Sequence, residues 1–330
     1  MINTPEFWYK NDIIAKLKSF LLFPFSVVWI ILSLIKKNFI KRYKSNLKVI
    51  CVGNLSIGGT GKTPFAIKTF KVLEILGFKP VFLTRGYKGI EKGPIEVNNS
   101  HDYKDVGDEA LLLNKVGTTI ISSNRCLGAK YIEGLKKKFD VIIMDDGLQN
   151  YQLEQDIRIL LIDKKLLFGN GHCIPAGPLR ESSRQGLKKI DAIVFTGDNE
   201  IKDINLNLID NIEIFDTNLK VTDNPKIKQF NYLAFCGLAN PMKFYNTLKE
   251  NNFKVALTKS FPDHYKYNNK EMKKLRQEAK SKNLKLITTE KDYVRIEDKE
   301  NIINVLPIEI KLSKKDENRF KSFLKEKIND

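Results

Sequence analysis

The feature that most constrains this chain is an eight-residue glycine-rich loop, SIGGTGKT, at positions 56–63. The apolar run LKVICV comes directly before it, and a segment with helical periodicity, 62–76, begins at its end. Glycines in such a loop let backbone N–H groups curl around phosphate oxygens at the start of a helix. A strand, this loop and a helix in that order predict a P-loop.

The loop positions are therefore candidates for binding a nucleoside triphosphate. Lys62 is expected to reach the β- and γ-phosphates, where it would also be catalytic, and the Thr63 hydroxyl is expected to bind Mg²⁺. The usual pattern begins with glycine, whereas this loop begins with Ser56, but the interior glycines are retained. The candidate nucleotide-binding residues are Ser56, Ile57, Gly58, Gly59, Thr60, Gly61, Lys62 and Thr63.

A second motif, FDVIIMDDGLQ at 139–149, places two acids at the end of an apolar run. A strand that ends in an acid is the usual source of the second metal contact in P-loop enzymes. Asp145 and Asp146 are neighbours, so their side chains are expected to point to different sides, one towards Mg²⁺ and one towards water or a partner base. Taken alone, the motif also fits a strand that ends in an ordinary aspartate turn.

A third motif, GNGHCIPAGPLRE at 169–181, contains three glycines and two prolines. These residues predict a fixed, non-helical loop that ends in Arg180 and Glu181. Such a loop can bring a carboxylate to a metal and a guanidinium to a phosphate. By itself, a rigid surface loop accounts for the pattern at least as well.

Two weaker candidates are an aspartate and a histidine far apart in the sequence. Asp108, in VGDEA, and His264, in FPDHYKY, would together supply a base and its orienting partner for phosphoryl transfer to a hydroxyl. Taken alone, Asp108 is more simply a helix N-cap and His264 a loop histidine. A further segment, TTEKDYVRI at 288–296, predicts a turn at a strand edge and suggests no chemical role.

The remaining pattern predicts an α/β fold in two units. Apolar runs separated by helical segments are typical of a parallel sheet covered on both faces. We expect a P-loop core at 46–220 and a second, smaller α/β domain at 221–330 that closes over the site, with a linker or hairpin within 197–230. Strands are expected at 47–52, 80–84, 118–122, 140–144, 157–162, 192–195, 232–236, 253–257, 284–288 and 303–312. Helices are expected at 62–76, 108–116, 125–138, 241–250, 269–282 and the C-terminus.

The first 45 residues contain an uncharged apolar stretch, Ser19–Ile35, which lysines bracket at both ends. Its length is at the short limit for a membrane-spanning helix, about 17 residues, and Pro24 weakens regular helix near its start. The basic run that follows would lie on anionic headgroups at the cytoplasmic face. We expect residues 1–45 to form a membrane-associated helix that either spans the membrane or lies in its interface; the alternative is a buried core helix.

The formal net charge of +17 is compatible with a nucleic acid, an anionic membrane or an acidic substrate as partner. A bias towards lysine supplies much of it, because arginine accounts for only nine of the 56 basic residues. The sequence has no recognisable DNA-recognition helix and no run of interleaved aromatic and basic residues, so nucleic acid is not expected as a partner.

Taken together, these motifs resemble those of the tetraacyldisaccharide 4′-kinase family, which phosphorylates the lipid A precursor. The resemblance covers nearly the whole chain from residue 46, through SIGGTGKTP, LTRGYKG, VGDEA, DDGLQNYQLEQDI, GNGHCIPAGPLRE, FPDHYKY and TTEKDYVRI. It implies transfer from ATP, with Mg²⁺, to the 4′-hydroxyl of the lipid disaccharide at the cytoplasmic face of the inner membrane. No obligate protein partner is implied.

The resemblance also implies a role for each motif residue. Asp108 would take the proton from the sugar 4′-hydroxyl, and His264 would orient or tune it. Thr63, Asp145, Asp146 and Glu181 would surround the metal. Arg125, Gln149 and Arg180 would face phosphate or substrate.

Interpretations from two other classes compete with a kinase. A membrane-associated P-loop switch ATPase of the partitioning type carries a signature lysine two residues before the second glycine of its loop, where this chain has Ile57. A membrane adaptor that only binds nucleotide would leave the acids at 108, 145, 146 and 181 without a purpose.

Overall fold

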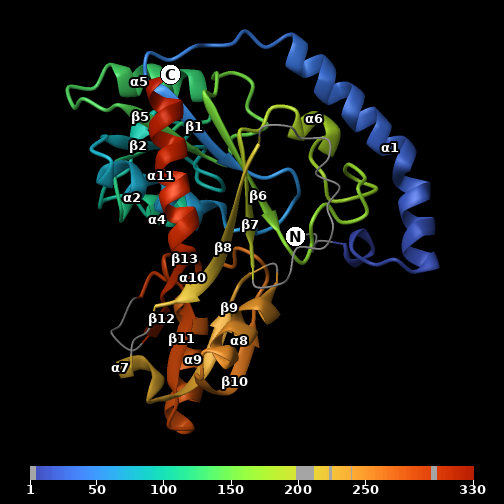
Figure 1. Cartoon of the computed structure of the whole chain (residues 1–330). Helices are drawn as coiled ribbons and strands as arrows, with labels where there is room; N and C mark the ends of the chain where they lie inside the picture. The colour runs from blue at the N-terminus through green and yellow to red at the C-terminus, as the bar shows by residue number, and fades with distance from the viewer. Residues whose placement is uncertain (1–4, 198–211, 223–224, 239, 299–302) are drawn as a thin grey trace.

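The computed structural model describes residues 5–197, 212–222, 225–238, 240–298 and 303–330. Figure 1 shows a larger and a smaller α/β unit, with a long N-terminal helix beside the larger one. The larger unit contains a nine-stranded sheet in the order β13-β8-β7-β6-β1-β5-β2-β4-β3. Its strands are β1 (Lys48–Gly53), β2 (Pro80–Thr84), β3 (Ile95–Glu96), β4 (Thr119–Ile121), β5 (Val141–Asp145), β6 (Ile157–Asp163), β7 (Ala192–Thr196), β8 (Glu213–Val221) and β13 (Ile308–Leu312).

The middle of this sheet positions the candidate loop. β1 pairs in parallel with β5 on one side and with β6 on the other. Apart from Lys48 and Asp145, the residues of β1 and β5 are apolar, and almost all are buried because helices cover both faces of the sheet. The carboxyl ends of parallel strands meet at one edge, so the P-loop after β1 and the aspartates at the end of β5 lie together.

Helices pack against the two faces of the larger sheet. On one face α2 (Lys62–Ile75) and α11 (Lys314–Asn329) lie together, with the rings of Phe65 and Phe320 centred 5.4 Å apart. On the other face lie α5 (Arg125–Glu133) and the short α6 (Ser183–Leu187). The short helices α3 (Tyr103–Val106) and α4 (Asp108–Asn114) connect β3 to β4.

The smaller unit is built on a four-stranded parallel sheet in the order β10-β9-β11-β12. Its strands are β9 (Asn231–Cys236), β10 (Lys254–Ser260), β11 (Lys285–Thr289) and β12 (Ile303–Leu306). α8 (Pro241–Glu250) packs on one face of the sheet and α9 (Asn269–Ser281) on the other. The short α7 (Pro225–Lys228) precedes β9, and α10 (Glu290–Tyr293) follows β11 directly.

The C-terminal part of the chain differs from the sequence-based expectation. The strand expected at 303–312 is divided at Pro307 into β12, in the smaller sheet, and β13, which pairs antiparallel with β8 in the larger sheet. Proline has no N–H to continue a ladder, so it marks the point where the chain leaves the smaller sheet. With β13 and α11 the chain returns to the larger unit. The smaller sheet therefore ends at Leu306 rather than at residue 312, and residues 308–330 of the expected second domain lie in the larger unit.

Two further expectations are changed by the tertiary structure. Part of the linker or hairpin expected at 197–230 is β8, which pairs in parallel with β7; residues 198–211 and 223–224 lie outside the described residues. Buried and exposed side chains largely alternate along β8, so it lacks the continuous apolar run that marked the central strands. The helix expected at 125–138 ends at Glu133.

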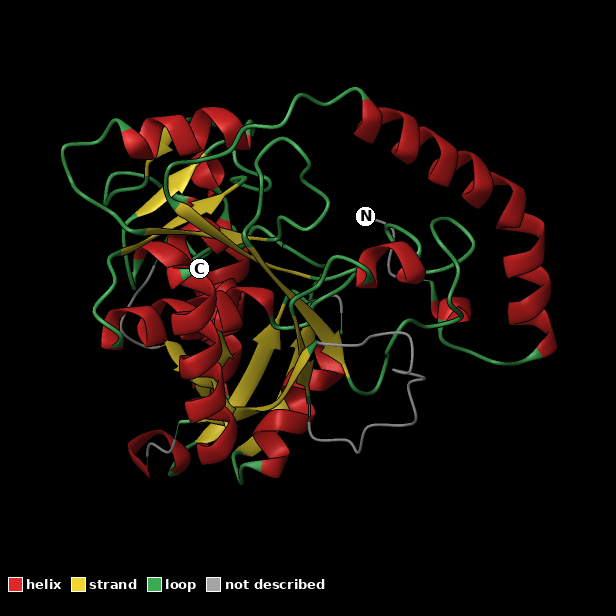
Figure 2. Ribbon diagram, turned by 45° about the horizontal axis from the view of Figure 1, so that its top comes forward, coloured by secondary structure: helices red, strands yellow, loops and turns green. Residues whose placement is uncertain are grey.

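The N-terminal segment forms the short η1 (Glu6–Trp8) and a single long helix, α1 (Ile13–Asn38), which continues through Pro24. Figure 2 shows that α1 bends along its length, as a proline inside a helix produces. Many of its apolar side chains are exposed, including Phe20, Leu21 and Phe25. Within the described residues it is the one helix long and apolar enough to cross a membrane. This exposure makes the alternative of a buried core helix wrong.

Candidate active site

The P-loop turns back on itself at the N-terminus of α2. Gly58 and Gly61 have φ angles of 130° and 84°, which glycine adopts without strain, and Gly61 is the N-cap of the helix. The Nζ atom of Lys62 lies 3.5 Å from the Gly58 carbonyl oxygen and 3.8 Å from an oxygen of Asp146. The lysine therefore lies across its own loop, where a P-loop binds the phosphates of a nucleotide.

The first aspartate of the DDGLQ motif is joined to the P-loop threonine. Thr63 Oγ1 donates a hydrogen bond of 2.8 Å to Asp145 Oδ2. The other carboxylate oxygen, Asp145 Oδ1, is buried without a hydrogen-bond partner among the described residues. Burial, with the charge of Glu109 next, raises the pKa of Asp145 to about 7. A hydroxyl and an unsatisfied carboxylate side by side are the hard oxygen donors that fit Mg²⁺.

The second aspartate has a different partner, as the neighbouring positions predicted. Asp146 has a φ of 54° and accepts two hydrogen bonds from Arg180, with Nη1–Oδ1 at 2.8 Å and Nη2–Oδ2 at 3.2 Å. Burial alone would raise the pKa of Asp146, but the charges of Lys62 and Arg180 lower it. Asp146 therefore holds Arg180 at the mouth of the P-loop.

Gln149 connects the remaining members of this cluster. Its Nε2 donates to Glu181 Oε1 at 3.0 Å, and its Oε1 accepts from Arg180 Nη1 at 3.2 Å. Tyr151 donates its hydroxyl to the other oxygen of Glu181 at 3.2 Å. Within the described ranges no three acidic, histidine or cysteine side chains converge on one metal position. The three acids expected around the metal are thus near one edge of the sheet but are not gathered at a point.

Arg125 occupies a different environment from Arg180. Its side chain is buried, Nη1 donates to the Ser122 carbonyl, and Nε has no hydrogen-bond partner among the described residues. Burial lowers the pKa of the guanidinium to about 10. The structure therefore does not bring Arg125 into hydrogen-bond contact with the other candidate residues.

The loop that carries Arg180 and Glu181 is fastened to the N-terminal helix. Ser19 Oγ and Ser26 Oγ donate to backbone carbonyls of loop residues 176 and 173, at 2.8 and 2.7 Å. Trp29 Nε1 donates to the carbonyl oxygen of Arg180 at 3.0 Å. The loop is therefore held from α1 as well as from the sheet, a connection that its own sequence does not reveal.

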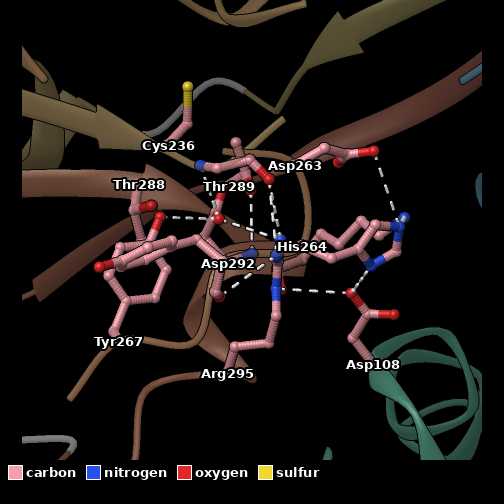
Figure 3. Close-up of polar contacts among 12 residues, drawn as sticks. Asp108, Cys236, Asp263, His264, Tyr267, Thr288, Thr289, Asp292 and Arg295 are labelled. Atoms are coloured by element: carbon pink, nitrogen blue, oxygen red, sulfur yellow. Dashed lines mark hydrogen bonds and ion pairs between the residues drawn. The ribbon is translucent and has the colours of Figure 1, made fainter. Parts of the chain in front are cut away.

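The aspartate and histidine that the sequence paired across a long separation lie in contact. His264 Nδ1 is 2.9 Å from Asp108 Oδ2, and both side chains are largely buried. Figure 3 shows the side chain of Asp108, which comes from α4, pointing towards the ring of His264, which belongs to the smaller unit. Gly107, not Asp108, is the N-cap of α4, so the simpler interpretation of Asp108 as an N-cap is wrong.

The segment 288–296, to which the sequence assigned no role, surrounds this pair. Arg295 Nε lies 3.4 Å from Asp108 Oδ2. Lys291 Nζ lies 3.4 Å from His264 Nε2 and 3.1 Å from Glu109 Oε1. The signal in the sequence was a run of charged residues directly after a predicted buried strand, because the end of β11 places them at the sheet edge.

Asp292 fixes this segment from inside the smaller unit. The side chain is fully buried, and its Oδ1 accepts from Gly237 N at 2.8 Å, Tyr267 OH at 2.9 Å and Arg295 Nη2 at 3.0 Å. Its Oδ2 accepts from Thr289 Oγ1 at 2.6 Å. A buried carboxylate with this many donors, one of them a guanidinium, is compensated for its loss of solvent.

The charges around Asp108 keep its carboxyl ionised. Burial alone would raise the pKa of Asp108, but the hydrogen bond from His264 and the charge of Lys291 lower it to about 2. Asp108 Oδ1 accepts from the Glu109 backbone N–H at 2.9 Å and retains a second lone pair. An ionised carboxylate with a spare acceptor position can receive a proton from a hydroxyl group.

The chain is similar along nearly its whole length to one family of enzymes. A family model described as tetraacyldisaccharide-1-P 4′-kinase matches residues 18–329. A tetraacyldisaccharide 4′-kinase from Rickettsia felis is 36% identical over 327 residues, which are 98% of each chain. One from Bartonella henselae is 37% identical over 301 residues, 90% of this chain and 86% of that one. The fold is similar to a crystal structure of LpxK from Aquifex aeolicus in complex with ATP, with a TM-score of 0.77, 28% identity and coverage of 94% and 99% of the two chains.

Proposed function

This chain belongs to the tetraacyldisaccharide-1-P 4′-kinase family, and we propose how its residues divide the reaction among them. The protein is a kinase of lipid A biosynthesis that transfers phosphate from ATP to the 4′-hydroxyl of the lipid A tetraacyldisaccharide precursor. The assignment of roles is carried by one observation: Asp108, the first residue of α4, is hydrogen-bonded to His264 of the smaller unit, and α4 packs against the P-loop helix α2.

The P-loop binds the triphosphate of ATP through residues 56–63, with Lys62 on the β- and γ-phosphates. Thr63 and Asp145 would hold Mg²⁺, which the unsatisfied Asp145 Oδ1 supports. When bound there, the ion would neutralise negative charge on the phosphate oxygens. Asp146 and Glu181 orient Arg180 and Gln149 next to the metal position through hydrogen bonds, rather than binding the metal as Thr63 and Asp145 would.

Asp108 is the base that accepts the proton of the sugar 4′-hydroxyl. As that O–H bond breaks, the hydroxyl oxygen forms a bond to the γ-phosphorus, and the bond to the bridging oxygen breaks with its electron pair leaving on ADP. His264 orients the Asp108 carboxylate. Because the two residues come from different units, the second domain completes the site when it closes over the larger one.

Arg180 and Gln149 bind phosphate groups or the sugar at the mouth of the P-loop. Arg180 is already oriented by Asp146, so its planar guanidinium loses little freedom when it binds a further anion. Arg125 acts at longer range through its positive charge, since its side chain is buried. These contacts would position the headgroup of the lipid disaccharide next to the γ-phosphate.

The exposed apolar helix α1 associates with a membrane, and we assign the protein to the cytoplasmic face of the inner membrane. The apolar surface of α1 and the basic residues that follow it support this placement. If it is right, full-length protein stays with membranes after a high-salt wash, which removes only electrostatic attachment, whereas a variant lacking residues 1–45 is released. Full-length protein in the salt supernatant would contradict the anchor.

The decisive experiment measures ATP turnover with and without the lipid disaccharide, in detergent, and identifies the phosphorylated product. A kinase consumes ATP in step with formation of the 4′-phosphate. A switch ATPase of the partitioning type would instead hydrolyse ATP at a rate that the disaccharide does not change. Equal turnover in both samples, with no phosphorylated lipid, would therefore exclude the proposed role.

A further inference from the structure

Lys291 contacts the His264 ring at Nε2, the ring nitrogen that does not face Asp108. Its ammonium lies 3.4 Å from His264 Nε2 and 3.1 Å from Glu109 Oε1. The lysine is carried by α10 in the smaller unit, while Glu109 is next to Asp108 on α4 of the larger one. Lys291 thus contacts the histidine of the pair and the neighbour of its aspartate at the same time.

The chemistry of these groups fixes where the protons lie. Burial alone would lower the pKa of Lys291, but the charges of Glu109 and Asp108 raise it, so the side chain is an ammonium at neutral pH. An ammonium has donors and no acceptor, and a carboxylate has acceptors and no donor. Asp263 Oδ2 also faces His264 Nε2, but at 3.9 Å it is too far for a hydrogen bond, whereas Lys291 Nζ lies at 3.4 Å. A neutral His264 therefore presents the Nε2 lone pair to Lys291, and its Nδ1 carries the hydrogen that is donated to Asp108.

We propose that Lys291 is a positioning residue that occupies Nε2 of His264 and thereby leaves Asp108 as the proton acceptor of the reaction. In the common arrangement of an aspartate beside a histidine, the aspartate orients the ring and the free ring nitrogen takes the proton. Here that nitrogen is engaged by a cation. The inference rests on the proposed role of the Asp108–His264 pair and adds Lys291 to it as a third member.

The alternative is a purely structural role, in which Lys291 only links the two units through its ion pair with Glu109. The two roles differ in which partner matters. If the ion pair is the purpose, removing the Glu109 charge should do the same damage as removing Lys291. If the contact with His264 is the purpose, Lys291 should lose its effect once the imidazole is gone.

The test compares kcat, the KM for ATP and the melting temperature of full-length Lys291→Met, Lys291→Arg, Glu109→Gln and His264→Asn proteins, and of the Lys291→Met/His264→Asn double variant. We expect Lys291→Met to lower kcat about 10- to 100-fold with an unchanged KM for ATP. Glu109→Gln should lower it less, and arginine at 291 should restore part of the loss. In the His264→Asn background the methionine should cost almost nothing further.

A second readout observes the ring itself. The ¹⁵N spectrum of histidine-labelled protein, with His264 assigned from the His264→Asn variant, should show a hydrogen on Nδ1 and none on Nε2. Hydrogen on Nε2 in the unaltered protein would overturn the inference. So would a double variant whose loss in kcat is the sum of the Lys291→Met and His264→Asn losses in free energy, together with a Glu109→Gln loss as large as that of Lys291→Met. Failure of the Asp108 assignment is distinguishable, because Asp108→Asn would then keep its kcat whatever Lys291 does.

Discussion

Replacement of Asp108 by asparagine tests the base assignment most directly, because it removes the charge and keeps the shape. The pKa of this carboxyl falls from 3.8 to about 2 on folding, and each pKa unit corresponds to about 1.4 kcal/mol. The ionised form therefore contributes about 2 kcal/mol to the free energy of unfolding. Asp108→Asn should lose a similar amount of stability, and as the base it should also lose about 10²–10⁴ in kcat.

The two effects are measured separately on the same protein. The kcat comes from 4′-phosphate formation on the lipid disaccharide at saturating ATP, and stability comes from chemical unfolding. His264→Asn should lower kcat less, because the imidazole orients the base and does not receive the proton. The double variant should fall far short of the product of the two single losses, since the pair acts as a unit. A rate loss that follows stability, with additive effects, would refute the pair as the catalytic base.

The lowered pKa also predicts how stability depends on pH. Because the folded carboxyl has the lower pKa, its stabilisation is fully present above the ordinary value of 3.8 and is lost as the pH falls through about 2. Unfolding of the unaltered protein should therefore become easier across this window. Asp108→Asn should lack that part of the pH dependence, and identical acid profiles would contradict the assigned environment.

Three further predictions follow from other contacts. Lys62→Ala should reduce turnover by orders of magnitude while the melting temperature changes little, because its two contacts are long; unchanged turnover would remove the P-loop assignment. Arg180→Lys loses the bidentate contact with Asp146 and should lower kcat/KM for the lipid about tenfold or more. Steady-state kinetics with the lipid, together with a measurement of ATP binding to the same variant, check this expectation. The paired change Ser19→Ala with Ser26→Ala should lower activity without releasing the protein from membranes in a sedimentation assay, because it frees the loop and leaves the apolar surface of α1 intact; full activity would show that α1 only tethers the enzyme.

The sequence alone identified the elements whose signal is local. The P-loop was predictable because its glycines, its lysine and the strand before it lie within a few consecutive residues. The central strands were predictable because a parallel strand buried on both faces reads as a continuous apolar run. The passage of the chain from one sheet to the other at Pro307 was not predicted. One strand of ten residues and two shorter strands in different sheets give almost the same sequence pattern, and only the strands with which each segment pairs distinguish the two arrangements.

The site divides in the same way. The types of the acting residues came from short motifs, and the family resemblance placed Asp108 with His264, but their contact depends on two units packing together across 156 positions of sequence. Neither the capture of Arg180 by Asp146 nor the fastening of its loop by Ser19 and Ser26 can be read from neighbouring residues. Consecutive residues were sufficient to predict a triphosphate-binding loop and the motifs that are candidates for its chemistry. The partners of Asp108 and its lowered pKa follow from the folded structure alone, because electrostatic effects depend on distances and burial that arise when the two units pack together.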